Sequence, residues 1–130
     1  MSKPDLRKRD LGKCEDMRVY AEKARRFMGD RTLEEFTADE MAQAAVLRCI
    51  EIVGEASRLV SCETRNRKPE IPWTLIVGTR NILAHVYGGV DLGKIYFVVT
   101  QHLPSLLENL AHLIAELEKE VKGTTGPEKS

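Results

Sequence analysis

The sequence predicts an all-α fold, an antiparallel bundle of four main helices with or without a short additional one. Three observations predict it. Apolar residues recur every three or four positions along most of the 130 residues, no segment shows the alternation of a half-buried strand, and the connections are short. A chain of this length is expected to form a single domain over residues 1–130, with a core over about 6–122 and a loose tail over 123–130.

The first two helices are predicted at residues 6–28 and 38–60, with Gly29 and Asp30 ending the first. Each carries an apolar stripe among charged residues. Two overlapping S/T-x-x-E capping signals, Thr32 with Glu35 and Thr37 with Glu40, lie between them, and we expect the second to open the longer helix. The stripes are Leu11, Cys14, Met17, Ala21, Ala24 and Met28, then Met41, Ala45, Val46, Cys49, Ile50, Ile52, Val53, Ala56 and Leu59.

Residues 61–71 lack periodicity and are predicted to be the main loop. Their basic run, Arg65-Asn66-Arg67-Lys68, is expected to be a solvated loop. The alternative is that it grips an RNA backbone, with Lys8 and Arg9 as weaker candidates.

Pro72 suits the first turn of a helix and is predicted to start the third one, which continues through His85 and ends near Gly88-Gly89. Trp73 on this helix is expected to be a packing anchor rather than a base-stacking platform.

The last helical segment is predicted over residues 92–121, with Asp91 as its cap and Pro104 dividing or kinking it. His102 and His112 within it have no metal-ligand spacing and are expected at the surface or the edge of the core. The apolar stripe beyond the proline consists of Leu106, Leu107, Leu110, Ile114 and Leu117.

Composition argues against several classes of protein. The 20 Lys and Arg residues balance 20 Asp and Glu residues, which removes the broad positive field of general nucleic-acid-binding proteins. No apolar run approaches a membrane span and the N-terminus is charged, so we expect a cytoplasmic protein with no membrane contact. Cys14, Cys49 and Cys62 have no close pair, so reduced thiols are expected, with Cys49 in the core and no zinc site.

A polar cluster on the predicted third helix is the candidate for chemistry. Arg80 and Tyr87 are seven residues apart and share a helical face, while Asn81 and His85 are four apart and share the neighbouring one. These groups suit RNA cleavage without a metal or cofactor, in which a 2′-hydroxyl attacks the adjacent phosphate. Histidine can move the proton and arginine can stabilise the charged phosphate. A single histidine suggests that a symmetric dimer supplies two copies.

Structural explanations remain open for this cluster and its neighbours. Arg80 and His85 could interact with the terminal carbonyls of their helix. Glu55 on the second helix is a candidate cleft residue that could orient either of them, or one half of a buried ion pair that holds two helices. Gly54 and Gly78 could let helices approach closely.

The segment IPWTLIVGTRNILAHVY at residues 71–87, followed by Gly89-Val90-Asp91, resembles the HepT-like family of the HEPN superfamily. The resemblance extends to the segments AVLR at residues 45–48 and IVGEA at 52–56, and to the pattern over 92–107. It covers most of the chain apart from the two termini.

This resemblance implies a HEPN-like helical homodimer that is a metal-independent endoribonuclease and the toxin of a type VII-like toxin–antitoxin pair. It implies that Arg80 and His85 are catalytic, that Asn81 binds or orients the substrate, and that Tyr87 is the modified residue. The implied partners are an RNA substrate and an MntA-like minimal nucleotidyltransferase. That antitoxin neutralises the toxin by AMPylation of the tyrosine, in a hetero-complex that could be larger than a dimer.

Two other functions compete with this one. Some HEPN proteins keep the motif and act as non-catalytic nucleotide- or partner-binding modules. The polar cluster could also be only a network at a dimer interface, in which case replacing His85 should lower stability or dimerisation rather than an activity.

Overall fold

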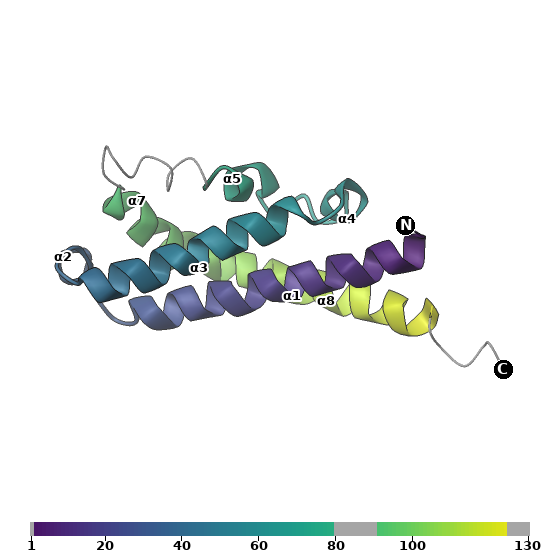
Figure 1. The fold of residues 1–130 in the computed structure, drawn as a ribbon, viewed down its shortest axis with the longest axis horizontal. Coiled ribbons are helices and arrows are strands. Elements are labelled where there is room, and N and C mark those ends of the chain that lie inside the picture. The colour runs from purple at the N-terminus through teal and green to yellow at the C-terminus, as the bar shows by residue number, and fades with distance from the viewer. Residues whose placement is uncertain (1, 80–90, 125–130) are drawn as a thin grey trace.

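The computed structural model describes residues 2–79 and 91–124, and these residues are all-α, without a strand. Three long helices lie lengthwise beside one another in Figure 1, with short helices at their ends and above them. The elements in chain order are α1 (Lys3–Met28), α2 (Leu33–Thr37), α3 (Glu40–Arg58), α4 (Cys62–Asn66), α5 (Trp73–Val77), α7 (Leu92–Phe97), the π-helical turn η2 (Val98–His102) and α8 (Leu103–Thr124).

Helix α1 forms as the sequence predicts and starts a little earlier. Its N-terminus is capped by the Ser2 hydroxyl, which accepts from the Asp5 amide at 3.3 Å. It ends at Gly29, whose positive φ of 57° suits glycine and whose amide donates to the Arg25 carbonyl at 2.9 Å. The predicted apolar stripe is confirmed, since five of its members are fully or almost fully buried: Cys14, Met17, Ala21, Ala24 and Met28.

The turn between α1 and α3 contains one of the two predicted capping boxes. Thr32 and Glu35 exchange the expected bonds, with the Glu35 amide donating to the Thr32 hydroxyl at 3.1 Å and the Thr32 amide to the Glu35 carboxylate at 2.9 Å. The second predicted box is wrong. Thr37 ends α2 and donates to the Leu33 carbonyl, whereas Asp39 caps α3 by accepting from the Ala42 amide at 3.0 Å.

Helix α3 buries a face that is rotated from the predicted stripe. Met41 is 85% exposed, so its placement in the stripe is wrong, whereas Cys49 is in the core as predicted. Ala42, the next residue, is buried in the core instead. The buried residues of α3 are Ala42, Val46, Cys49, Ile50, Val53, Gly54, Ala56 and Ser57.

The segment after α3 is not the loop that the sequence predicts, because it contains α4. Ser61 caps this helix by accepting from the Thr64 amide at 3.3 Å. Asp10 of α1, only 1% exposed, accepts hydrogen bonds from the Ser61 amide and hydroxyl at 3.0 and 2.6 Å and from the Thr64 hydroxyl at 2.5 Å. These contacts span more than fifty residues of sequence, so local pattern could not reveal them.

The basic run of residues 65–68 begins inside α4, and its last two residues are held more firmly than a solvated loop would be. Arg67 forms an ion pair with Glu120 of α8, and Lys68 lies 4.0 Å from Glu116. Both basic side chains are about three-quarters buried or more. The expectation of a solvated run is therefore wrong for these two residues, whose charges are used within the fold.

Helix α5 starts after Pro72, as predicted, and Trp73 is confirmed as a packing anchor. Its side chain is 8% exposed and its indole N–H donates to the Lys68 carbonyl at 3.0 Å. The helix ends at Val77, where the Gly78 amide donates to the Thr74 carbonyl at 2.9 Å. The predicted helix from Pro72 through His85 is therefore interrupted at Gly78, and its part from residue 80 onward lies outside the described residues.

The last part of the chain is helical from Leu92 to Thr124, with an irregularity next to Pro104 as predicted. Asp91 caps α7 by accepting from the Lys94 amide at 3.0 Å. The π-helical turn η2 lies immediately before α8, where proline lacks an amide donor and crowds the preceding turn. The predicted stripe on α8 is confirmed by the burial of Leu106, Leu110, Ile114 and Leu117.

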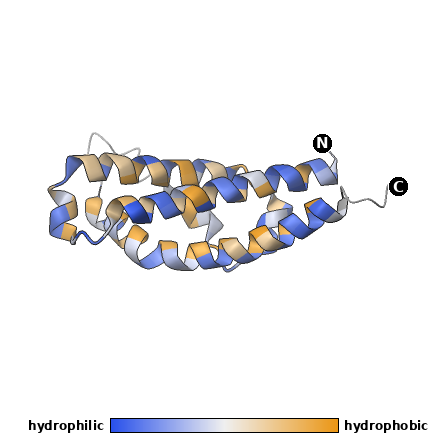
Figure 2. Ribbon diagram, turned by 90° about the horizontal axis from the view of Figure 1, so that it is seen from below, coloured by the Kyte–Doolittle hydropathy of each residue, from blue (hydrophilic) through white to orange (hydrophobic). Residues whose placement is uncertain are grey.

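The core lies where the three long helices meet. The chain runs along α1, turns through α2 and returns along α3, so these two helices are antiparallel, and α8 runs in the same direction as α3 (Figure 1). Hydrophobic residues alternate with hydrophilic ones along each long helix in Figure 2. The prediction had four main helices, whereas the described residues contain three long ones. Among them, no helix is long and apolar enough to span a membrane.

Candidate active site

The predicted catalytic cluster lies outside the described residues. Arg80, Asn81, His85 and Tyr87 all belong to the segment 80–90, of which the structure describes nothing. The structure does describe both ends of that segment, residue 79 on one side and residue 91 on the other. The candidate site is therefore built from these two ends and the helices that hold them.

The end at Thr79 lies at a close approach between α3 and the turn after α5. Thr79 is 9% exposed, and its hydroxyl donates to the Ile76 carbonyl at 2.7 Å. A Cβ atom added to Gly54 would lie 2.8 Å from the Thr79 hydroxyl oxygen and 3.3 Å from the Ile76 carbonyl oxygen. A side chain at position 54 would therefore require Thr79 or this turn to shift, so glycine is what permits the observed position of Thr79.

The backbone around Gly54 is itself fixed by a buried hydroxyl. Ser57 is fully buried, and its hydroxyl donates to the Gly54 carbonyl at 2.7 Å. The expectation of a close helix approach is thus confirmed for Gly54. It is wrong for Gly78, because the atoms nearest to an added Cβ there belong to Thr74 and Leu75 of the preceding turn.

The end at Asp91 is held by α7. Ile95 is fully buried, and the Tyr96 hydroxyl donates to the Arg31 carbonyl at 2.8 Å. The Tyr96 ring also contacts Phe36 of α2, with ring centroids 6.3 Å apart. The residue before segment 80–90 is therefore a buried threonine beside α3. The residue after the segment caps α7, which is anchored on α2.

Glu55 directly follows Gly54 and is the one predicted site residue that the structure describes. Its side chain is 47% exposed and accepts from the Arg58 guanidinium at 2.6 Å, within the same helix. This hydrogen bond and the negative charge raise the pKa of Arg58 above its usual value. Glu55 is thus half-exposed, rather than buried as the ion-pair alternative required. The role of Glu55 toward Arg80 or His85 stays a prediction.

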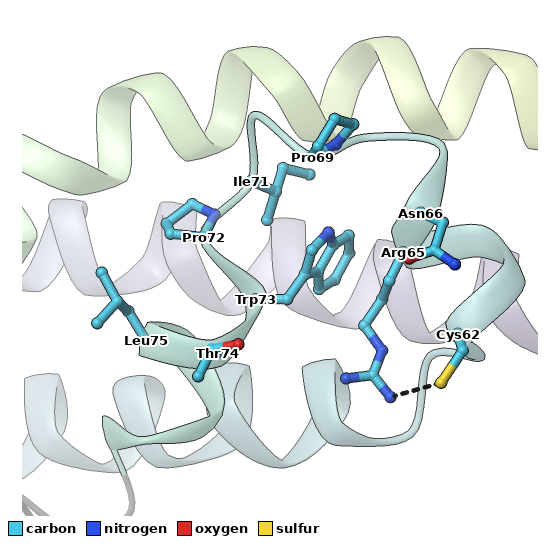
Figure 3. Close-up of a pocket in the computed structure, with 9 residues that line it drawn as sticks. All are labelled: Cys62, Arg65, Asn66, Pro69, Ile71, Pro72, Trp73, Thr74 and Leu75. Carbon is cyan, nitrogen blue, oxygen red and sulfur yellow. Dashed lines mark hydrogen bonds between the residues drawn. The ribbon is translucent and has the colours of Figure 1, made fainter.

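A hollow of about 440 Å³ lies between α4 and α5, and the sequence reasoning did not find it. Figure 3 shows Trp73 at its centre, with Arg65 and Cys62 to one side and Leu75 to the other. The only sequence feature that could have indicated this hollow is the basic run beside the Ile-Pro-Trp segment. The lining residues are Cys62, Arg65, Asn66, Pro69, Ile71, Pro72, Trp73, Thr74 and Leu75.

Histidines and cysteines of the described residues stand apart from these features. His102 and His112 are exposed, as predicted, and the His102 ring lies edge-on to Phe97 at 5.1 Å. No group of three potential metal ligands gathers in the residues that the structure describes.

Cys14 and Cys49 are buried and Cys62 is exposed. Burial, assisted by nearby Asp10 and Glu15, raises the pKa of Cys14 to about 12.

Comparisons with known proteins agree with the resemblance in the sequence. A family model described as ribonuclease HepT-like matches residues 17–113. A probable ribonuclease HepT of Thermococcus cleftensis is 36% identical over 92 residues, which is 71% of this chain and 84% of the relative. A protein of Methanocaldococcus jannaschii named as a putative RNase is 39% identical over 80 residues, 62% of this chain and 73% of the relative. No solved structure matches the chain significantly.

Proposed function

Since this chain belongs to the HepT-like ribonuclease family, we propose that it is a metal-independent endoribonuclease and the toxin of a cytoplasmic toxin–antitoxin pair. The observation that carries the proposal is the family match over residues 17–113. The matched range includes an intact R-x4-H-x-Y sequence at Arg80, His85 and Tyr87.

The proposed reaction is an internal transfer at phosphorus. His85 takes the proton from a ribose 2′-hydroxyl, whose oxygen forms a bond to the adjacent phosphorus. The bond from phosphorus to the 5′-oxygen breaks, and that oxygen takes a proton, which leaves a 2′,3′-cyclic phosphate and a 5′-hydroxyl end. Arg80 stabilises the added negative charge on the phosphate oxygens, and Asn81 orients the phosphate.

The proposed enzyme is a homodimer because each chain offers one histidine in the motif. Cleavage of this kind is fastest when one group acts as base and another as acid. A two-fold axis that brings the two segments 80–90 together would supply both from identical chains.

The proposed control is covalent modification of Tyr87. An MntA-like nucleotidyltransferase would attach AMP to its hydroxyl, which adds bulk and negative phosphate within the motif. Substrate phosphate would then be excluded by steric overlap and by like-charge repulsion. Mass spectrometry of the toxin co-expressed with its antitoxin should find AMP on Tyr87, and a Tyr87→Phe toxin should remain active in the presence of the antitoxin.

Glu55 is proposed as a positioning residue for Arg80 or His85, since it follows the glycine that contacts Thr79. Glu55→Gln keeps the shape and removes the charge. If Glu55 orients His85, this variant should shift the pH profile of cleavage with little change in KM. A purely structural role would lower stability and leave the pH profile of the folded protein unchanged.

The test is cleavage of a 5′-labelled RNA by purified protein in the presence of excess chelator. Arg80→Ala and His85→Ala should each lower the rate by at least a hundredfold, the size expected for loss of a group that stabilises the developing charge or of one that transfers a proton. His112→Ala is the matched control, because His112 is an exposed histidine on α8, and it should cleave at the wild-type rate. RNA binding without any cleavage by unmodified wild-type protein would favour the non-catalytic module.

A further inference from the structure

We propose that the hollow between α4 and α5 binds one nucleotide of the RNA substrate, with the phosphate at Arg65 and the base over the apolar surface around Trp73. This inference rests on the proposed function, because it assigns a subsite to the same RNA strand. It concerns residues of α4, of α5 and of the connection between them, none of which belongs to the R-x4-H-x-Y motif.

The size and lining of the hollow fit a nucleotide. Its volume of about 440 Å³ lies within the range of small-ligand sites, roughly 300 to 1,000 Å³. Pro69, Ile71, Pro72 and Leu75 give it apolar walls around the Trp73 ring, and none of its lining residues is acidic. Leu75 is 72% exposed, so the apolar surface remains open to solvent at one side and can take a flat base.

Arg65 is placed to receive a phosphate. Its Nε atom donates to the Val60 carbonyl at 3.0 Å and one terminal nitrogen contacts the Cys62 sulfur at 3.8 Å. A guanidinium has five N–H donors, so these two contacts orient the group and leave three donors for a ligand. Arg65 also has no carboxylate partner within residues 2–79 and 91–124.

The neighbouring cations differ from Arg65 in this respect. Arg67 is paired with Glu120 and Lys68 with Glu116. Arg65 is therefore the one cation of the basic run that has no carboxylate partner among the described residues, and it lines the hollow. Asn66 beside it is exposed and has no hydrogen bond from its side chain to the described part of the chain. Its amide offers both a donor and an acceptor for the edge of a base.

The position of the hollow relative to the motif fits one continuous RNA strand. Leu75 lies on α5, which has five residues and spans about 8 Å at the usual rise of 1.5 Å per residue. The turn after α5 leads through Thr79 into Arg80. A strand with one phosphate at the motif could therefore place a neighbouring nucleotide in the hollow, which would favour some bases over others beside the cleaved bond.

The fluorescence of Trp73 tests the proposal directly, because it is the only tryptophan in the chain. The probe is a short RNA with every 2′-hydroxyl methylated, which cannot undergo internal cleavage. Titration with this probe should change Trp73 emission and saturate. Arg65→Gln should weaken binding about tenfold, as expected for loss of charge-assisted hydrogen bonds, and Asn66→Ala should change the preference among probes of different base.

Arg25→Gln is the matched control for charge. Arg25 is exposed in the last turn of α1 and forms no ion pair within the described chain, and its loss should change the affinity by less than twofold. Thermal unfolding of each variant separates loss of the fold from loss of binding. Because Arg65 also bonds to the Val60 carbonyl, the exposed Asn66 provides a second variant should Arg65→Gln unfold.

Several outcomes would overturn the proposal. The first is a Trp73 emission that stays constant while the probe binds. The second is an equal loss of probe affinity in Arg65→Gln and Arg25→Gln. The third is an emission that responds to a protein partner and not to the probe. If wild-type protein cuts RNA but Trp73 does not respond, only the subsite is wrong. If Trp73 responds in the predicted way but no RNA is cut, the subsite holds and the proposed nuclease function fails.

Discussion

At Gly54, the missing side chain lets the backbone of α3 approach the turn that precedes Arg80. The sequence suggested a close approach at this position and at Gly78, and only the structure separates the two. A Cβ added to Gly54 would meet Thr79 and Ile76, which lie in and after α5, whereas one added to Gly78 would meet atoms of its own turn. Two glycines of similar local context thus differ in a tertiary contact, which sequence spacing does not encode.

Gly54→Ala should destabilise the protein and reduce cleavage. The added methyl group would lie 2.8 Å from the Thr79 oxygen. The shifts that such overpacking forces typically lower the free energy of unfolding by about 1 to 3 kcal/mol. The turn before Arg80 should move as a result. Gly12→Ala is the control, because its added methyl meets no atom within 4 Å on an exposed helical site, and it should be stabilising by about 0.5 to 1 kcal/mol. Denaturant unfolding measures both, and equal effects would contradict this account.

Asp10 is a second residue whose role appears only in the structure. It is an acidic residue in a stripe of charges by sequence, yet its carboxylate is buried and accepts three hydrogen bonds from Ser61 and Thr64. It therefore ties α1 to the start of α4. This contact places the helix that carries Arg65.

Asp10→Asn should lower the free energy of unfolding by about 1 to 3 kcal/mol, since an amide nitrogen cannot accept the bonds that one carboxylate oxygen accepts. Chemical denaturation at neutral pH measures the loss. Asp16→Asn is the control, because Asp16 is 54% exposed and its ion pair with Lys13 spans 4.0 Å; its effect should be within about 0.5 kcal/mol. A small effect at Asp10 would show that the buried contact contributes little to the fold.

Elements with a strong apolar period were predictable, and elements set by distant contacts were not. The stripes of α1 and α8 are regular and long, and both helices form where they were expected. Helix α4 depends on Ser61 and on Asp10 of α1, so the local sequence of this segment alone predicts a loop. The start of α3 was displaced because Asp39, two residues after Thr37, is the better placed cap.

Capping by Asp39 should make stability sensitive to acid. Hydrogen bonds from the Ala42 amide and from Arg31 lower the pKa of Asp39 below its usual value. A group whose pKa is lower in the folded state contributes stability above its unfolded pKa of about 3.9 and loses it as pH falls through the folded value.

The variant Asp39→Ala should therefore be less stable than wild type at pH 7, and the difference should shrink as pH falls below about 4. Denaturant midpoints at a series of pH values measure it. Asp30→Ala, at an exposed residue of the same connection, serves as the control and should show no such trend. A difference between Asp39→Ala and wild type that is constant with pH would contradict the capping role.

The whole molecule has balanced charge and three long helices around one core. Its fold class and family could be predicted from the sequence, since helical period and the Ile-Pro-Trp to Gly-Val-Asp context extend over much of the chain. The hollow between α4 and α5 could not, because it requires the placement of α4 by contacts from α1. The described part of the candidate site consists of the residues on either side of segment 80–90 and the helices that hold them. The R-x4-H-x-Y motif inside that segment is a prediction from the sequence.

The proposed dimer predicts the mass of the particle in solution. Light scattering coupled to size exclusion should give twice the chain mass of 14.7 kDa, and activity per chain should fall on dilution below the dimer's dissociation constant. Each isolated chain would offer only one motif histidine. A fully active particle with the mass of one chain would contradict the shared site.

The chemical identity of the RNA ends tests the central claim most directly. Wild-type protein, incubated with RNA and excess chelator, should yield 2′,3′-cyclic phosphate and 5′-hydroxyl ends, identified by mass spectrometry, and His85→Ala should yield neither. Cleavage that leaves 5′-phosphate ends, or the same ends at the same rate from His85→Ala, would contradict an internal transfer that depends on Arg80 and His85.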